Sequence, residues 1–132
     1  MSSTGMRSIA GYLRSCSAVT DTVSDSEIRF GWPDELEEFP CIIMTQVGGS
    51  DTGYLGYKSS AAGSRMRREE FTIQLNVISR TRKQTYDLSD TIIPMLIASG
   101  ACRKDSDVDD FSDERRIYNK ILTFSTTIHH DD

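Results

Sequence analysis

The sequence has few of the residues that build redox, metal and catalytic centres. Its 132 residues include only three cysteines and two histidines. The cysteines, Cys16, Cys41 and Cys102, are widely spaced and form no CxxC pair, which argues against a disulfide framework and against the usual zinc motifs. We therefore predict that they are small, buried, apolar side chains.

Long apolar segments are also absent. No run approaches the roughly 20 residues that cross a bilayer, and the N-terminal segment lacks the apolar stretch of a signal peptide. We therefore expect a protein made inside the cell that does not enter a membrane. The length and the 37% hydrophobic and 27% charged residues are typical of one globular domain, here spanning residues 1–132. The net charge of −5 disfavours a protein that coats DNA.

Apolar spacing predicts two helices and four strands. Met6, Ile9, Leu13 and Cys16 recur at helical spacing, which predicts a first helix ending near Val19. Alternation of apolar and polar residues over 71–77 is the clearest strand signal. The second helix is predicted over 83–99, where Pro94 should kink or break it, and the other strands over 27–32, 41–47 and 116–128.

The predicted fold class is α+β. We expect a four-stranded, mainly antiparallel sheet with two helices on one face, in the order helix, strand, strand, strand, helix, strand. Two segments are predicted as loops. Residues 48–66 are rich in Gly and Ser, and loops of that length are usually functional or disordered. Residues 105–114 are acidic.

Candidate chemical sites are weak. Residues 129–132 read His-His-Asp-Asp, but we expect a frayed tail in which adjacent side chains point apart. Residues 105–110 resemble the start of a calcium loop, yet Asp110 occupies the glycine position and Arg116 the position of the bidentate glutamate. Residues 53–59 resemble a phosphate-binding loop, but their sequence departs from the motif. The sequence therefore predicts no catalytic, cofactor-binding or metal site, and no enzyme.

Charge is strongly segregated along the chain. Residues 58–83 hold seven basic and two acidic side chains, residues 21–38 hold seven acids and one arginine, and residues 105–114 hold six acids and no base. These segments are either independent solvated faces or complementary surfaces of identical subunits that meet head-to-tail, which makes a ring if the rotation closes. The candidate interface residues are Arg65, Arg67, Arg68, Arg80, Arg82, Asp105, Asp107, Asp109 and Asp110.

The element order and several local phrases resemble one protein family. After the N-terminal helix, Phe39-Pro40-Cys41-Ile42-Ile43 opens a strand that leads into the long Gly-rich segment. Residues 71–81, FTIQLNVISRT, then run into a helix with Tyr86, Leu88 and Asp90, and residues 118–124, YNKILTF, close the pattern. This arrangement, which covers most of the chain, resembles the tail-terminator and tail-completion proteins in the neck of long-tailed phages and related archaeal viruses.

The resemblance implies a structural virion protein without cofactor or reaction. It implies a homo-oligomeric ring, commonly a hexamer, that caps the tail tube, stops its polymerisation and faces the head-side connector. Its partners would be copies of itself, the tail tube protein and the connector. Arg65, Arg67 and Arg68, if they line the opening, would face acidic tube loops or the passing DNA.

The polar positions Thr72, Gln74 and Asn76 are candidates for pairing with a neighbouring subunit. Two other classes of function remain open at this point. One is a head-side connector or another interaction protein of the same particle. The other is a small enzyme or ligand-binding domain, against which the scarcity of histidine and the lack of a Gly-rich turn after a strand both argue.

Overall fold

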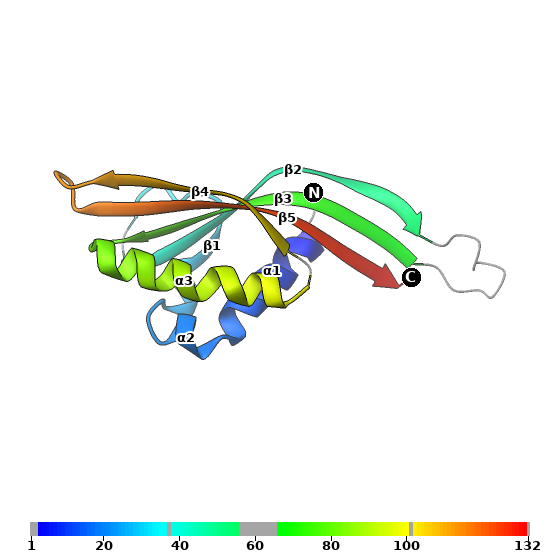
Figure 1. Ribbon diagram of the computed structural model, residues 1–132, viewed down its shortest axis with the longest axis horizontal. Coiled ribbons are helices and arrows are strands. Elements are labelled where there is room, and N and C mark those ends of the chain that lie inside the picture. The colour runs from blue at the N-terminus through cyan, green and yellow to red at the C-terminus, as the bar shows by residue number, and fades with distance from the viewer. Residues whose placement is uncertain (1–2, 37, 56–65, 101, 132) are drawn as a thin grey trace.

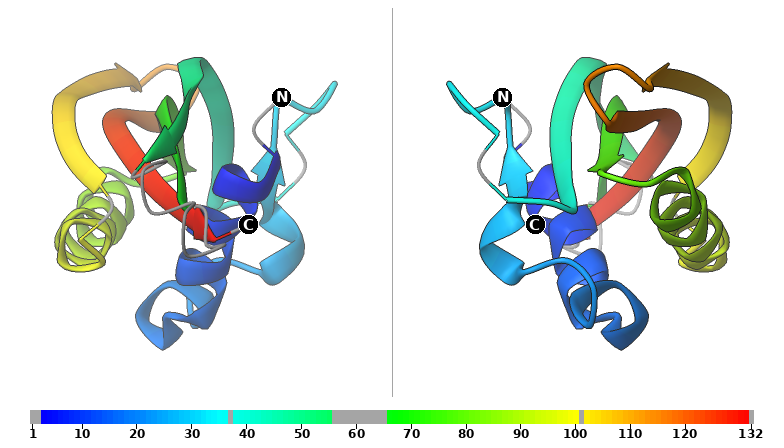
Figure 2. Two further views of the ribbon diagram at one scale, coloured as in Figure 1. Left: turned by 90° about the vertical axis from the view of Figure 1, so that its right-hand side faces the viewer. Right: turned by 90° about the vertical axis from the view of Figure 1, so that its left-hand side faces the viewer.

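The computed structural model describes residues 3–36, 38–55, 66–100 and 102–131. Within them, helices gather on one face of a five-stranded sheet that arches over them (Figures 1 and 2). The elements follow in the order α1 (Ser3–Ser15), α2 (Ser17–Thr20), a 3-10 turn (Asp25–Glu27), β1 (Ile28–Phe30), β2 (Cys41–Leu55), β3 (Met66–Ser79), α3 (Arg82–Ala98), β4 (Cys102–Ser112) and β5 (Ile117–Asp131).

The sheet has the strand order β1-β2-β3-β5-β4. β1 pairs with β2 in parallel, and every other neighbouring pair is antiparallel. The α+β class and the mainly antiparallel sheet are therefore confirmed. The predicted count of four strands is wrong, because the segment between α3 and β5 forms a fifth strand at the edge of the sheet.

That fifth strand, β4, replaces the predicted acidic loop. β4 pairs with β5 from Cys102↔Thr126 to Ser112↔Ile117, with one irregularity between Lys104 and Ser106. The segment contains so many aspartates that its polarity indicated a loop. Two of those aspartates, Asp107 and Asp109, instead bind Lys120 of β5 across the strand pair.

The first predicted helix is interrupted at Cys16. Its backbone is extended there, with φ −88° and ψ 110°, so α1 ends at Ser15 and α2 is a separate short helix. The apolar spacing is confirmed, since Met6, Ile9 and Leu13 are buried in the core. Cys41 and Cys102 are buried as predicted, whereas Cys16 is only partly buried and packs against the core.

The second predicted helix, α3, begins with a side-chain cap. The Thr81 hydroxyl accepts a hydrogen bond from the amide of Gln84 at 3.2 Å, which satisfies one of the free N–H groups of the first turn. Pro94 does not end the helix, which continues to Ala98. Pro94 lies on the exposed side, where water can bond the carbonyl that loses its partner.

β2 is longer than the strand that the apolar residues over 41–47 predict. Its pairing with β3 passes an irregularity between Gln46 and Gly48 and continues to Leu55↔Met66. Residues 48–55 are thus strand and not loop, while residues 56–65 of the predicted loop lie outside the described residues. We call the far end of this three-strand ribbon the arm: residues 48–55 of β2, 66–70 of β3 and 127–131 of β5. The arm runs past the helices (Figure 1).

The C-terminal residues as far as Asp131 belong to the sheet and do not form the predicted frayed tail. His129 and His130 belong to β5 and pair in register with Arg68 and Arg67 of β3. The prediction of a tail was wrong because residues 125–131 lack the strong apolar alternation that marks residues 71–77.

Two apolar clusters hold the layers together. The main core lies between the helices and the sheet and includes Ile9, Leu75, Leu88 and Phe124. A smaller cluster lies on the opposite face, where Cys41, Ile43 and Ile78 are covered by Leu36, Phe39 and Ile117. Leu36 and Phe39, which precede β2, therefore lie over one end of the sheet, at the end opposite the arm.

Candidate interaction surfaces

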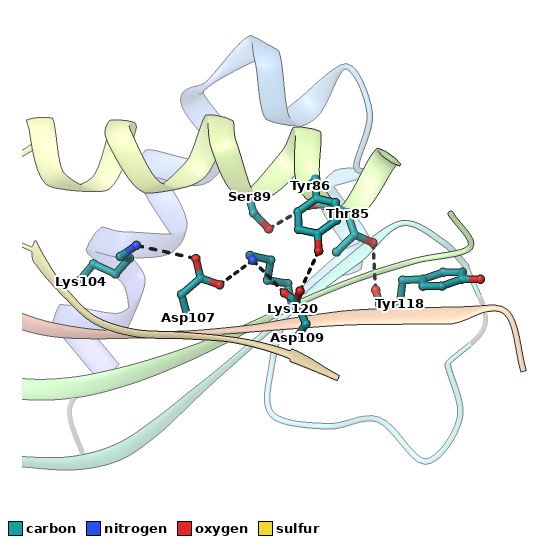
Figure 3. A network of polar contacts seen from close by, with 8 residues as sticks. All are labelled: Thr85, Tyr86, Ser89, Lys104, Asp107, Asp109, Tyr118 and Lys120. Atoms are coloured by element: carbon teal, nitrogen blue, oxygen red, sulfur yellow. Dashed lines mark hydrogen bonds and ion pairs between the residues drawn. The ribbon is translucent and has the colours of Figure 1, made fainter. Parts of the chain in front are cut away.

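The most connected polar group lies where β4, β5 and α3 meet (Figure 3). Lys120 is only 8% exposed, and its Nζ bonds Asp107 Oδ1 at 2.7 Å and Asp109 Oδ1 at 2.9 Å. Tyr86 of α3 donates its hydroxyl to the other oxygen of Asp109 at 2.7 Å. Lys104 adds a weaker contact to Asp107 at 3.7 Å. This group of contacts, the Lys120 network, holds the acidic strand β4 against the helix α3.

An aromatic cluster continues the same seam towards the β4–β5 turn. Phe111 makes edge-to-face contacts with Tyr86 and Tyr118, with ring centroids 5.6 and 5.4 Å apart. Arg82 lies over the rings of Phe111 and Tyr118 and binds both oxygens of Asp113 at 2.8 Å. The guanidinium of Arg82 is thus occupied within the subunit.

The buried start of α3 carries a second polar contact with the sheet. The Thr85 hydroxyl lies 2.9 Å from the carbonyl of Tyr118 and 2.6 Å from the Ser79 hydroxyl (Figure 3). Thr85 and Ser79 are both fully buried. The carbonyl of Tyr118 belongs to β5, so this hydrogen bond fixes the position of α3 along that strand.

These contacts shift the pKa values of the acids on β4 and its turn. Hydrogen bonds from Lys120 and Tyr86 hold the pKa of Asp109 below its usual range. Arg82, followed by Tyr118, lowers the pKa of Asp113 in the same way. Burial would lower the pKa of Lys120, but its hydrogen bonds to the two aspartates outweigh burial and raise it. The ionised forms are the stable ones near neutral pH.

The structure therefore places most of the candidate interface residues in contacts within one subunit. Asp105 bonds the Ser125 hydroxyl and Arg103, which lowers its pKa. Arg80 bonds the carbonyl of Arg115 at 3.1 Å and lies 4.3 Å from the centre of the Phe39 ring. Among the described residues, Asp110 makes no hydrogen bond or ion pair. The interface itself stays a prediction.

The predicted basic residues are split between two places. Arg80 and Arg82 lie at the start of α3, near the β4–β5 turn, while Arg67 and Arg68 lie in the arm. Arg67 pairs in register with Tyr54 on one side and His130 on the other, and Arg68 pairs with His129. Arg65 lies outside the described residues. The arm thus gathers arginine and histidine positions from two neighbouring strands.

The sheet face that carries Thr72, Gln74 and Asn76 is the one without helices. Thr72 and Gln74 are half-buried, whereas Asn76 is 1% exposed. The amide nitrogen of Asn76 and the amide oxygen of Asn119 have no hydrogen-bond partner among the described residues. An unsatisfied buried polar atom costs roughly 1–3 kcal/mol. Pairing of this face with a neighbouring subunit stays a prediction.

Two features of the surface were missed by the sequence reasoning. Lys120 looked like an ordinary polar residue of the last strand, and only its pairing with β4 brings it to Asp107 and Asp109. Phe30 and Trp32 looked like strand residues, but their side chains are 49% and 52% exposed. A signal was present for the second feature, because Pro33 stops strand pairing; β1 ends at Phe30, so Trp32 lies just beyond the strand predicted over 27–32.

In the part of the chain that the structure describes, no group of three or more His, Cys, Asp or Glu residues is arranged to hold a metal ion. No helix there is long and apolar enough to span a bilayer.

Comparison with known proteins gives a likeness of fold. No family model and no curated protein matches the chain. The structure is similar to a chain in the virion of a native gene transfer agent particle, with a TM-score of 0.56 and 6% identical residues. The alignment covers 97% of this chain and 97% of that chain. The two chains therefore share an architecture from end to end, although their sequences have little in common.

Proposed function

We propose that this chain is a structural protein of a virus particle. The observation that carries the proposal is the end-to-end likeness of fold to a chain of a gene transfer agent virion, at 97% coverage of both chains. A match of that extent covers nearly the whole of both chains. Fold alone does not fix function, so the proposal rests on this likeness together with the charge pattern of the surface.

Within the particle, we place the chain at the end of the tail tube in the neck, as a tail terminator. Copies of the chain form a ring, a hexamer in this proposal, that stops tail polymerisation and joins the tail to the head-side connector. Acidic residues gather around segment 31–40 at one end of β2, and the other end carries positions of both signs, Arg67 and Arg68 beside Glu69 and Glu70. Contacts between unlike surfaces of identical chains are head-to-tail, and they close into a ring when the rotation between neighbouring subunits closes.

The role requires shape and charge and no chemical step. The chain acts through its contacts with itself, with the tail tube protein and with the connector, and it uses no cofactor. The ring opening would admit DNA, and Arg67 and Arg68, if they line it, would contact either the phosphate backbone or acidic loops of the tube.

Native mass measurement of the purified chain, followed by imaging of particles assembled without it, tests the proposal. A ring of defined mass, together with overlong or headless tails in the depleted particles, is the expected result. A chain that binds filled heads but not preassembled tail tubes would instead be a head-side connector. A selective rise in thermal stability with one nucleotide or metal would indicate a ligand-binding domain and contradict the structural role.

A variant with Arg67→Glu and Arg68→Glu tests the part played by the arm. We expect loss of assembly or of tail joining, because both changes reverse charge at adjacent positions of β3. Arg115→Glu is a matched control, since Arg115 is an exposed arginine of the β4–β5 turn, far along the sheet from the arm. Normal virion yield from the arm variant would refute this role.

A further inference from the structure

A small apolar cluster on the helix-free face of the sheet lies under a thin cover. Its members Cys41, Ile43 and Ile78 are at most 1% exposed. Leu36 and Phe39, which precede β2 and are only partly buried themselves, pack against it, and we call these two side chains the cover. Neither belongs to a helix or a strand, and neither makes a hydrogen bond between main-chain groups within the described part of the chain. Side-chain contacts therefore hold the cover in place.

Arg80, which lies between β3 and α3, connects the cover to a distant turn. Its guanidinium lies 4.3 Å from the centre of the Phe39 ring, within the range of a cation–π contact. The same group donates to the carbonyl of Arg115 at 3.1 Å and to that of Arg116 at 3.5 Å. Both carbonyls belong to the β4–β5 turn. One exposed arginine thus ties the ring of the cover to the main chain of that turn.

Two buried polar atoms beside the covered cluster have no partner. The side-chain nitrogen of Asn76 and the side-chain oxygen of Asn119 make no hydrogen bond among the described residues. Asn76 pairs in register with Ile43, and Asn119 pairs with Ile78, so both amides lie next to the cluster on the same face. The closed cover therefore leaves one donor and one acceptor unsatisfied. An amide group of a partner would satisfy both, since it donates and accepts hydrogen bonds.

The sheet face next to the cover is uncharged on the two central strands β3 and β5. Three pairs of residues face each other there: Thr72 with Ser125, Gln74 with Thr123, and Asn76 with Ile121. The chain carries a net charge of −5, so copies of it repel one another overall. A face without charge is where two identical subunits approach with the least repulsion. A second copy of the chain is therefore the partner that suits this face.

We propose that Leu36 and Phe39 form a displaceable cover, held in place by Arg80, that shields the uncharged sheet face until a neighbouring subunit displaces it. The inference rests on the proposed assembly and adds the step that controls it. Release of the Arg80 contact frees the ring of Phe39 and exposes the apolar cluster. It also lets an amide of the neighbour reach Asn76 and Asn119. The closed cover thus limits association of single subunits.

The thiol of Cys41 reports the state of the cover, because it is fully buried in the covered cluster. In a chain with Cys16→Ser, the remaining thiols are Cys41 and Cys102, and Cys102 belongs to the main core. We expect Arg80→Met to raise the rate at which a disulfide reagent labels Cys41 at least about tenfold, while the rate of Cys102 stays unchanged. Peptide mass mapping after timed labelling gives the two rates separately.

Two further variants separate the cover from general stability. Arg82→Met is the matched control, since it removes a nearby exposed arginine with other partners and should leave Cys41 labelling unchanged. Phe39→Leu keeps an apolar side chain over the cluster but removes the ring that Arg80 contacts, so it should raise Cys41 labelling. Unchanged Cys41 rates in Arg80→Met and Phe39→Leu would overturn the proposed cover. A rise that Cys102 shares would also overturn it, because both thiols then report unfolding of the whole chain.

The protein concentration needed for assembly tests the second half of the proposal. Native mass spectrometry should find Arg80→Met assembled at about tenfold lower concentration than the Cys16→Ser parent, because its sheet face is already open. Selective labelling of Cys41 without a fall in that concentration would overturn the role of the cover in assembly. A parent chain that stays monomeric, both alone and on tail tubes, would overturn the proposed ring, whereas the thiol rates would still decide whether Arg80 holds the cover.

Discussion

The ammonium group of Lys120 lies 4.9 Å from the centre of the Tyr86 ring, and both side chains bind the carboxylate of Asp109. Tyr86 belongs to α3 and Lys120 to β5, so a single carboxylate of β4 connects all three elements (Figure 3). The edge strand is held by polar contacts where an apolar pattern would be usual. The stability of this seam should therefore respond to charge and to pH.

Replacing Lys120 with methionine should lower the free energy of unfolding by about 1–2 kcal/mol. The change preserves most of the side-chain volume but leaves Asp107 and Asp109 without their common partner, and both are partly screened by water. Urea unfolding measures the loss. Lys104→Met is the control, since Lys104 is exposed and touches Asp107 only at 3.7 Å. An equal loss in the two variants would contradict a special role for Lys120.

Acid should destabilise the fold through Asp109 and Asp113. Their pKa values in the folded chain lie below the ordinary value of 3.8, so the unfolded chain takes up protons first as the pH falls. Their stabilisation is complete well above pH 3.8 and is lost as the pH falls through that value towards the lower folded pKa. Urea midpoints measured down a pH series should drop less steeply for Asp109→Asn/Asp113→Asn than for the wild type. Parallel curves would count against this account.

Replacing Thr85 with valine should cost about 1–2 kcal/mol of stability. Valine has nearly the same shape, but it removes the hydroxyl that bonds the carbonyl of Tyr118 and the hydroxyl of Ser79 in the buried seam. The matched control is Thr91→Val, because the Thr91 hydroxyl bonds only a carbonyl of its own helix at the surface. Thermal unfolding followed by circular dichroism compares the two, and a T91V effect as large as that of T85V would refute the prediction.

The three thiols should differ in reactivity. Burial raises the pKa of Cys41 to about 11 and also raises that of Cys102, so both remain protonated and covered at pH 8, whereas Cys16 is partly exposed. A disulfide reagent should therefore modify one thiol rapidly in the native protein and three in urea. The Cys16→Ser variant should lose the rapid phase. If that phase persisted, one of the buried thiols would have to be accessible.

Much of the architecture follows from apolar spacing alone. The alternation over residues 71–77 gave the centre of β3, and the helical spacing of Leu88, Ile92 and Leu96 gave the buried face of α3. These elements bury one face against the main core, so the period of their apolar residues reports their structure directly. The same reasoning failed where the inward side chains are not apolar.

β4 is the clearest such failure. Its positions on the side of α3 include Asp107 and Asp109, and their common partner, Lys120, lies on another strand. Pattern reasoning treats each segment by itself, so it cannot detect a charge pair between strands that are adjacent only after folding. The charge blocks were detected from the sequence, but the structure was needed to separate the acids bound inside the subunit from those that are not.

The position of β5 inside the sheet has a consequence for synthesis. β4 precedes β5 in the chain, yet among the described strands only β5 pairs with it. While the chain is being made, β4 therefore emerges before the strand that will hold it. We expect its aspartates to keep this segment hydrated and to repel other copies, so that the charges that later meet Lys120 first oppose aggregation of the unfinished protein.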